Sequence, residues 1–370
     1  MVDEHRALEK ARICPTPLLE PPLHKKMRVL ITGHRGYIGA HAIDVFQNAG
    51  HHVTGVDIGL YDGVEFGTPA VADNDLTMDV FDITPEMLEG IEAVVHLAAI
   101  SNDPMGDLDP AITHHINTGG TLHVAKCAKE AGVPRFLFAS SCSIYGAAGD
   151  KILDETAEFT PVSAYAESKV NAEAQLKALE SDDFSVTYLR NSTAYGQSPR
   201  LRTDLAVNNL LAFAVSINEV KLMSDGTSWR PLVHCRDIAR AFCALSEAPL
   251  ETVRGLAVNI GGNDDNYQIC EVAEIVHDNV EGSEITIAET AVPDPRNYRV
   301  CFDLLNKTLP EFKLEWSVRS AVPVMYTEYK ERHGFAAEFD SGRYTRLVTL
   351  QGKMADGTLP HYFEELSRKD

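Results

Sequence analysis

The sequence predicts an α/β fold with a doubly wound parallel sheet and a smaller C-terminal lobe, and three observations predict it. Apolar, strand-like runs alternate with helical patterns through the first half of the 370-residue chain. The first run, Met27–Thr32, is apolar almost throughout, as expected for a strand buried on both faces. After about Tyr195 short strands and helices mix, which indicates the second lobe.

Each element is predicted from its own pattern. The first helix carries one apolar stripe and ends near Gly50; the stripe is formed by Ile38, Ala42, Ile43 and Phe46. Further strands are expected at His52–Asp57, Ala93–Ala99, Arg135–Ser140, Ser185–Arg190 and Leu256–Ile260. Helices are expected between them, for example at Leu122–Ala131 and Ala164–Leu179. A strand–helix–strand order of this kind gives a parallel sheet with right-handed crossovers.

Composition and charge exclude several classes of function. The formal net charge is −21, and a nucleic-acid binder needs a basic surface, so we expect no nucleic-acid partner. No run of 18 apolar residues is present, so we expect no membrane span. The seven cysteines include no C-x-x-C pair, which indicates reduced thiols and a cytoplasmic location.

A glycine-rich turn stands between the first strand and the first helix. The segment Thr32–Gly39 reads TGHRGYIG. Glycines at such a turn let the backbone approach a pyrophosphate, and the helix N-terminus adds free N–H groups and a positive dipole end. Asp57 closes the second strand, where a carboxylate accepts hydrogen bonds from ribose hydroxyls and repels a 2′-phosphate. The pattern predicts a Rossmann-type site for NAD rather than NADP. A capping role for Asp57 is the alternative.

A tyrosine and a lysine share one face of the helix predicted at Ala164–Leu179. Tyr165 and Lys169 are spaced i, i+4. A phenol is a poor base at neutral pH, and we expect the ammonium of Lys169 to lower the pKa of Tyr165. Tyr165 could then move a hydroxyl proton while a hydride moves to or from nicotinamide. An ordinary amphipathic helix is the alternative interpretation.

A hydroxyl-rich segment follows the strand at Arg135–Ser140 and reads SSCSIYG from Ser140 to Gly146. The carboxyl end of a parallel strand faces the ligand crevice, so one serine here can hold a reacting oxygen near Tyr165. Cys142 is expected to be a small buried thiol rather than an acid or nucleophile. The histidine pairs His51-His52 and His114-His115 lack the i, i+4 spacing of metal ligands, so no metal site is expected.

Together these residues resemble the extended short-chain dehydrogenase/reductase superfamily, and within it the NAD-dependent nucleotide-sugar epimerase/dehydratase family. The resemblance runs from about Met27 to about Trp316. Four motifs occur in the order that the family has: the glycine box, the His96–Ala99 box, the Ser-Ser-x-x-x-Tyr-Gly box and Tyr165-x-x-x-Lys169.

The resemblance implies roles for individual residues. Ser141, four residues before Tyr145, is implied as the catalytic hydroxyl beside Tyr165 and Lys169. The implied cofactor contacts are Gly33, Gly36, Tyr37, Ile38, Asp57, Asp79, Val80, Leu97, Ala98, Ala99, Asn117, Tyr165 and Lys169. The implied substrate contacts are Ser143, Thr193, Asn209, Arg230 and Arg299, with Arg296 as the alternative to Arg299. Read without the resemblance, Asp79 is equally an ordinary strand-end aspartate and each arginine a surface charge.

Departures from the family pattern narrow the expected reaction. The 4,6-dehydratases carry an acid just after the catalytic hydroxyl, where this chain has Cys142 and Ser143, so we expect no dehydration. The epimerase-reductases similar to fucose synthase place a cysteine where this chain has Ser143, so we also do not expect their acid/base epimerisation. Many 4-epimerases have an asparagine where this chain has Thr193, which leaves the sugar open.

The sequence therefore predicts an NAD-dependent nucleotide-sugar epimerase that acts at C4 through a transient 4-keto sugar. An NAD(H)-dependent ketoreductase or dehydrogenase, a decarboxylase, and a non-catalytic dinucleotide-binding protein are the alternatives. The resemblance also implies a homodimer. The expected organisation is an N-terminal arm (1–26), a region that is mainly NAD-binding (27–195), a region that is mainly sugar-nucleotide-binding with some strands returning to the sheet (196–332), and a C-terminal extension of unknown role (333–370).

Overall fold

A computed structural model describes residues 26–101, 103–147, 149, 151–291 and 296–359, so the arm predicted at 1–26 lies almost entirely outside the described residues. The core is a seven-stranded, all-parallel sheet in the order β11-β7-β5-β4-β1-β2-β3. Its strands are β1 (Arg28–Thr32), β2 (His52–Asp57), β3 (Asn74–Thr77), β4 (Ala93–His96), β5 (Arg135–Ser141), β7 (Ser185–Asn191) and β11 (Ala257–Ile260). The predicted fold class is confirmed.

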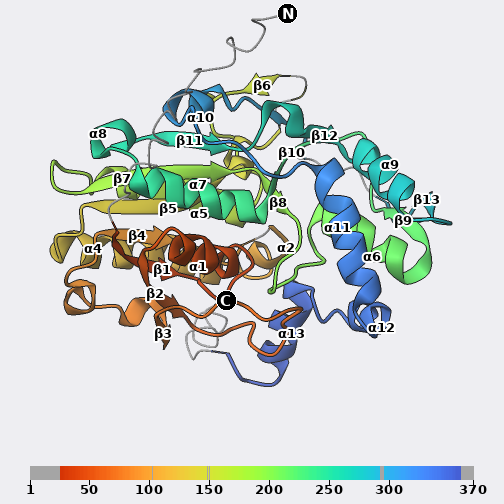
Figure 1. The fold of residues 1–370 in the computed structure, drawn as a ribbon, viewed down its shortest axis with the longest axis horizontal. Coiled ribbons are helices and arrows are strands. Elements are labelled where there is room, and N and C mark those ends of the chain that lie inside the picture. The colour runs from red at the N-terminus through yellow and green to blue at the C-terminus, as the bar shows by residue number, and fades with distance from the viewer. Residues whose placement is uncertain (1–25, 102, 148, 150, 292–295, 360–370) are drawn as a thin grey trace, which may run out of the picture.

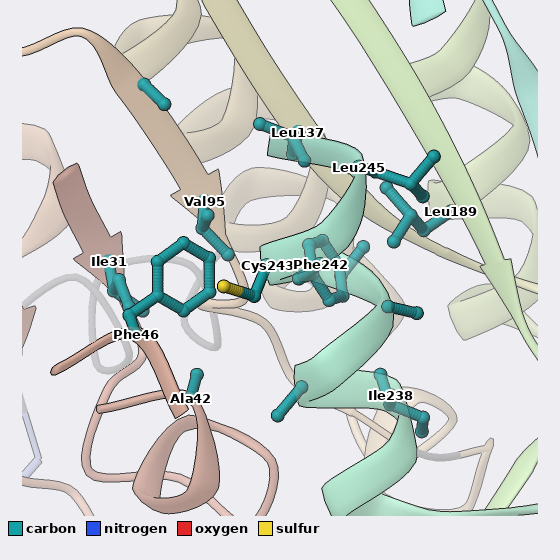
Figure 2. Packing of buried hydrophobic residues seen from close by; sticks show 14 of the residues in the cluster. Ile31, Ala42, Phe46, Val95, Leu137, Leu189, Ile238, Phe242, Cys243 and Leu245 are labelled. Atoms are coloured by element: carbon teal, nitrogen blue, oxygen red, sulfur yellow. The ribbon is translucent and has the colours of Figure 1, made fainter. Parts of the chain in front are cut away.

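Two helical layers cover this sheet because its strands are apolar on both faces. Helices α1 (Gly39–Asn48) and α7 (Cys235–Glu247) pack side by side against one face (Figure 1), and Figure 2 shows Phe46 and Phe242 beside Ile31, Val95 and Leu137. Helices α4 (Thr121–Glu130) and α5 (Ala164–Lys177) cover the other face. Alternate strand residues go to opposite layers: Ile31 belongs to the first and Leu30 to the second.

The remaining elements between β2 and β7 are short. They are the 3₁₀ turns η1 (Val80–Asp82), η2 (Pro85–Leu88) and η4 (Cys142–Tyr145), the helices α2 (Asp103–Gly106) and α3 (Pro110–His114), the π-helical turn η3 (His115–Gly120), and strand β6 (Ile152–Leu153). The π-helical turn contains Asn117, whose side chain is fully buried. Such turns frequently occur at functional sites.

The smaller lobe gathers at the carboxyl ends of the strands, on the right of Figure 1. Its core is built mainly by α6 (Ala206–Ile217), α9 (Ile269–Asn279), α11 (Val318–Glu331) and α12 (Phe335–Asp340). Its strands are β8 (Thr193–Tyr195), β9 (Glu219–Leu222), β10 (Trp229–His234), β12 (Asn266–Gln268) and β13 (Glu284–Ile287). The short η5 (Asn263–Asp265) and β14 (Arg299–Val300) lie beside β10, whereas α8 (Leu250–Val253) and α10 (Asp303–Thr308) pack on the main sheet beside β7 and β11. The strand predicted at Leu256–Ile260 is β11, which forms the edge of the main sheet beside β7.

The described part of the C-terminal extension, residues 333–359, is largely helical. Helix α13 (Arg346–Ala355) inserts Leu350 into a small apolar cluster with Ile100, Met105 and Ile112. This contact places the last described helix beside α2, close to the carboxyl ends of the main sheet. Among the helices of the described residues, none is long and apolar enough to cross a membrane.

Candidate active site

One large cavity of about 760 Å³ lies where the parallel strands end and the smaller lobe begins. Such a crevice at the carboxyl ends of the strands is where open α/β sheets bind ligands. Most of the residues that the sequence predicted line it: Gly33, Gly36, Tyr37, Ile38, Asp57, Asp79, Val80, Leu97, Ala98, Ala99, Ser141, Ser143, Tyr165, Lys169, Thr193, Asn209 and Arg230. The fold therefore brings together predicted residues from several strand ends and from both parts of the chain.

The glycine-rich turn has no room for side chains. Gly33 has a φ of +72°, and a Cβ there would come within 2.7 Å of the backbone nitrogen of Ala98. A Cβ on Gly39 would lie 2.2 Å from the carbonyl oxygen of Gly33. The bare backbone at the start of α1 is thus held close to the segment after β4, which forms a cradle of the kind that a pyrophosphate needs.

The carboxylate of Asp57 closes the same end of the cavity. It accepts hydrogen bonds from the backbone nitrogens of Arg35 (3.0 Å) and Gly59 (2.8 Å). These bonds fix the carboxylate at the cavity wall, beside the glycine-rich turn. The cradle and this acceptor are the donor and acceptor set that the diphosphate and a ribose of NAD require, so the residues present fit that cofactor.

The predicted pair on α5 meets Ser141 inside the cavity. Ser163 caps the helix by accepting from the backbone nitrogen of Ala166, and Tyr165 and Lys169 follow on one face. Ser141 and Tyr165 both line the cavity, Ser141 lowers the pKa of the Tyr165 phenol, and the amine nitrogen of Lys169 lies 5.7 Å from the centre of the Tyr165 ring. A hydroxyl, a phenol and an amine therefore converge from β5 and α5 on one wall.

The expectation that the ammonium of Lys169 lowers the pKa of Tyr165 is wrong, because this pKa is raised. Burial raises the pKa of Tyr165 to about 12, while the hydrogen bond to Ser141 and the charge of Arg202 act in the opposite direction. Burial also lowers the pKa of Lys169 to about 7, so its amine is only partly charged near neutrality. Burial outweighs the opposing charges, Arg202 for Tyr165 and Glu173 for Lys169, because both side chains lose their contact with water.

The low pKa of Lys169 makes stability depend on pH. Below about pH 7 the amine is protonated in both the folded and the unfolded chain, so its full burial cost applies. Between about pH 7 and the ordinary value of 10.5 only the unfolded chain holds the proton, so the folded state gains stability as the pH rises. In NAD-free protein, we expect the free energy of unfolding to rise with pH by roughly 1 kcal/mol per unit relative to Lys169→Met. Urea unfolding of both proteins from pH 6.5 to 8.5 measures this, and a constant difference would contradict it.

Glu173 is a functional candidate that the sequence reasoning missed. It lies one further turn along the face of Tyr165 and Lys169, and its charge raises the pKa of Lys169 against the effect of burial. Its carboxylate accepts from Ser140 Oγ at 2.5 Å and pairs in a bidentate manner with Arg190, with Nη2 to Oε2 at 2.8 Å and Nε to Oε1 at 3.1 Å. The i, i+4, i+8 spacing of 165, 169 and 173 was the signal that could have identified it.

Asn117 lies behind the cavity wall, so it is not a lining residue. Its amide nitrogen donates to the carbonyl of Ile100 (3.0 Å) and to Ser168 Oγ (3.0 Å), and its oxygen accepts from the nitrogen of Ile100 (2.8 Å). Asn117 therefore ties the segment after β4 to α5, and supports the wall that carries Tyr165.

Ser143 and Cys142, two neighbouring positions considered in the sequence, differ in whether they line the cavity. Ser143 lines the cavity, and its buried Oγ has no hydrogen-bond partner among the described residues, as expected of a group kept for a ligand. Cys142 lies outside the cavity lining, where its thiol donates to the carbonyl of Arg190 and burial raises its pKa to about 12. A thiol held in that way is not an acid at neutral pH.

At the end of the cavity that carries arginines, one predicted position is wrong. Arg299 does not line the cavity: it lies on β14, and its guanidinium stacks 4.9 Å from the Trp229 ring. The alternative residue, Arg296, lines the cavity and pairs with Asp103 at 2.6 Å. Arg230 is buried on β10 and donates to the carbonyl of Arg296, so these two arginines lie together.

Four further lining residues carry charge or amide groups that no motif indicated. Arg202 and Asp204 form a bidentate pair with distances of 3.0 and 3.1 Å, and Arg202 also donates to Ser101 at 3.1 Å. Arg346 enters from α13. Asn191, at the end of β7, lines the cavity with a buried oxygen that has no partner among the described residues.

His51 has an acidic and a cysteine neighbour in the fold, although neither is near it in the sequence. His51, Cys243 and Glu247 place their ligand-type atoms within 4.8 Å of one another. However, the backbone nitrogen of Met27 donates to His51 Nδ1 at 3.1 Å, which leaves the proton on Nε2, directed at Glu247 at 3.0 Å. The group is therefore a satisfied core histidine rather than a metal centre.

Known proteins resemble this chain in sequence and in fold. The model of the NAD dependent epimerase/dehydratase family matches residues 29–261. The chain belongs to this family. It is accordingly an NAD-dependent enzyme of the extended short-chain dehydrogenase/reductase type.

Three similar proteins show the range of the family. The uncharacterized UDP-glucose epimerase YtcB of Bacillus subtilis is 27% identical over 286 residues, covering 70% of this chain and 84% of the relative. The UDP-glucuronate 4-epimerase of Thermodesulfobacterium geofontis is 28% identical over 263 residues, covering 67% and 79%. The structure of MoeE5 in complex with UDP-glucuronic acid and NAD has a TM-score of 0.71 and 25% identity, and the match covers 82% of this chain and 99% of that one.

Proposed function

We propose that the protein is a nucleotide-sugar 4-epimerase. The observation that carries this proposal is the meeting of Ser141, Tyr165 and Lys169 in a cavity that has a dinucleotide cradle at one end and Arg230 at the other. The arrangement suits a ligand pair in which the cofactor occupies the first end and the diphosphate of an activated sugar the second. Similarity to relatives named as UDP-glucose and UDP-glucuronate epimerases supports the substrate class.

The residues of the chain supply the proton chemistry of this reaction. Bound NAD would accept a hydride from the sugar carbon and return it. Tyr165 would take the proton of the C4 hydroxyl and give it back, and Ser141 would hold the reacting oxygen at the same place. Lys169 and Glu173 would set the charge around the phenol. The buried hydroxyl of Ser143, free among the described residues, would contact the sugar.

The residues after Ser141 favour epimerisation over dehydration. A dehydration step needs an acid beside the reacting hydroxyl to expel a second hydroxyl as water. Cys142 is outside the cavity lining and its pKa is about 12, and Ser143 is a neutral alcohol. Proton transfer by Tyr165 alone is sufficient for reversible oxidation at C4.

Proton NMR of a nucleotide-sugar mixture tests the proposal. Purified protein is incubated with UDP-glucose, UDP-N-acetylglucosamine or UDP-glucuronate, and the signals of the C4 epimers are followed. We expect one of these to equilibrate with its C4 epimer while the absorbance of reduced nicotinamide stays constant. Stoichiometric formation of reduced cofactor would indicate a dehydrogenase or ketoreductase instead, and carbon dioxide release from the uronate would indicate a decarboxylase.

A further inference from the structure

A buried arginine reaches the cavity from the C-terminal extension. Arg346 is the first residue of α13 and is only 3% exposed. Its guanidinium lies 4.1 Å from the centre of the Tyr61 ring, and Nη2 donates to the carbonyl of Arg200 at 3.3 Å. The apolar contacts of Leu350 with the α2 and α3 region hold the helix in place. The position of Arg346 is therefore fixed by packing rather than by an ion pair.

Part of this guanidinium is left without a partner. Nη1 of Arg346 is buried and makes no hydrogen bond within the described residues. The neighbouring Arg202 is also buried and is paired with Asp204 through two hydrogen bonds. Burial, followed by the charge of Arg202, lowers the pKa of Arg346 to about 10. Two adjacent guanidinium groups in a cavity repel one another, and an anionic ligand would relieve that repulsion.

The two arginines contact residues in segments that also line the cofactor end of the cavity. Tyr61, beneath Arg346, comes four residues after Asp57 and lines the cavity. Ser101, which accepts from Arg202, comes two residues after Ala99. The charge of Arg202 also acts on Tyr165, so Arg202 lies within electrostatic reach of the proposed reacting centre.

We propose that Arg346 and Arg202 form an anion-binding pair that takes a phosphate or carboxylate group of a bound ligand. A guanidinium binds both groups through charge-assisted hydrogen bonds, and Nη1 of Arg346 has the donors to supply one. Two sources offer this chemistry: the diphosphate of NAD, and an acidic group on the sugar. The sugar source rests on the proposed function; the cofactor source does not.

Substitution of Arg346 tests the pair directly. Arg346→Met removes the charge but keeps the length of the side chain, and Arg346→Lys keeps the charge. Arg343 is the matched control, because it lies in the same extension outside the cavity lining, where it donates to the carbonyl of Gly63 at 2.9 Å. Thermal unfolding without ligand shows whether each variant folds. The binding of NAD is then titrated by calorimetry without sugar, and UDP-glucuronate and UDP-glucose are titrated with NAD present.

The outcomes separate the two sources. If the pair binds the cofactor, Arg346→Met weakens NAD binding by about 10- to 100-fold, the usual loss for one charge-assisted hydrogen bond, and Arg346→Lys recovers part of it. If it binds the sugar acid, NAD binding is unchanged and the affinity for UDP-glucuronate falls by a similar factor while that for UDP-glucose does not. A folded Arg346→Met that binds all three ligands as Arg343→Met does would overturn the inference. All readouts are binding constants, so the result is independent of whether epimerisation is the reaction.

Discussion

Replacement of Tyr165 by Phe should lower the turnover number by about a thousandfold or more, because the variant lacks the group that exchanges a proton with the sugar hydroxyl. The ring of Tyr165 stays in place in this variant, and only the phenol hydroxyl that faces the cavity is lost. NAD binding should therefore change little. A spectroscopic or NMR assay of turnover, together with the NAD content of the purified protein, measures both quantities.

Tyr188→Phe is the matched control for this experiment. Tyr188 is also buried, and its hydroxyl donates to Glu180 at 2.7 Å, but it does not line the cavity. It should keep turnover close to that of the unchanged protein. Equal turnover in Tyr165→Phe and Tyr188→Phe would mean that the phenol of Tyr165 takes no part in the reaction.

Replacement of Glu173 by Gln should have the largest effect on stability. Arg190 is 5% exposed and pairs with both carboxylate oxygens of Glu173, so the neutral amide leaves a buried guanidinium without its counter-charge. Loss of one partner of a buried pair typically costs about 3 to 5 kcal/mol. The same change removes the charge that raises the pKa of Lys169, so that pKa should fall further below 7.

Denaturant unfolding at pH 7 measures the stability loss. The exposed Lys177, on the same helix, pairs with Glu180 at 2.7 Å and offers the control Lys177→Gln. Because an exposed pair contributes little, this control should lose less than about 1 kcal/mol. A Glu173→Gln protein as stable as Lys177→Gln would show that the buried pair is not needed for folding.

The strands were predictable because burial on both faces leaves a clear mark in a sequence. The predicted strand Arg135–Ser140 is one residue shorter than β5, and His52–Asp57 coincides with β2. The wall of the site was predictable for a related reason. In a parallel sheet the strand ends meet at one edge, so motifs that follow strands come together.

The rest of the site could not be predicted because it depends on packing between distant segments. Arg202 and Arg346 belong to no motif, and the fold alone brings them to the cavity. Spacing on α5 placed Lys169 beside Tyr165, but it carried no information on how deeply both would be buried, and burial decides the pKa of each. Arg299 was misplaced by three residues because its short strand, β14, turns the side chain toward Trp229.

The position of β11 has a consequence for how the protein is made. Residues 192–256 separate the edge strand β11 from β7, the strand it pairs with, and this stretch includes α7, which covers one face of the sheet. During synthesis the ribosome must therefore release much of the smaller lobe before the sheet can be completed. Until then the apolar surface that α7 later covers faces water, and a nascent chain in that state is a natural client for chaperones.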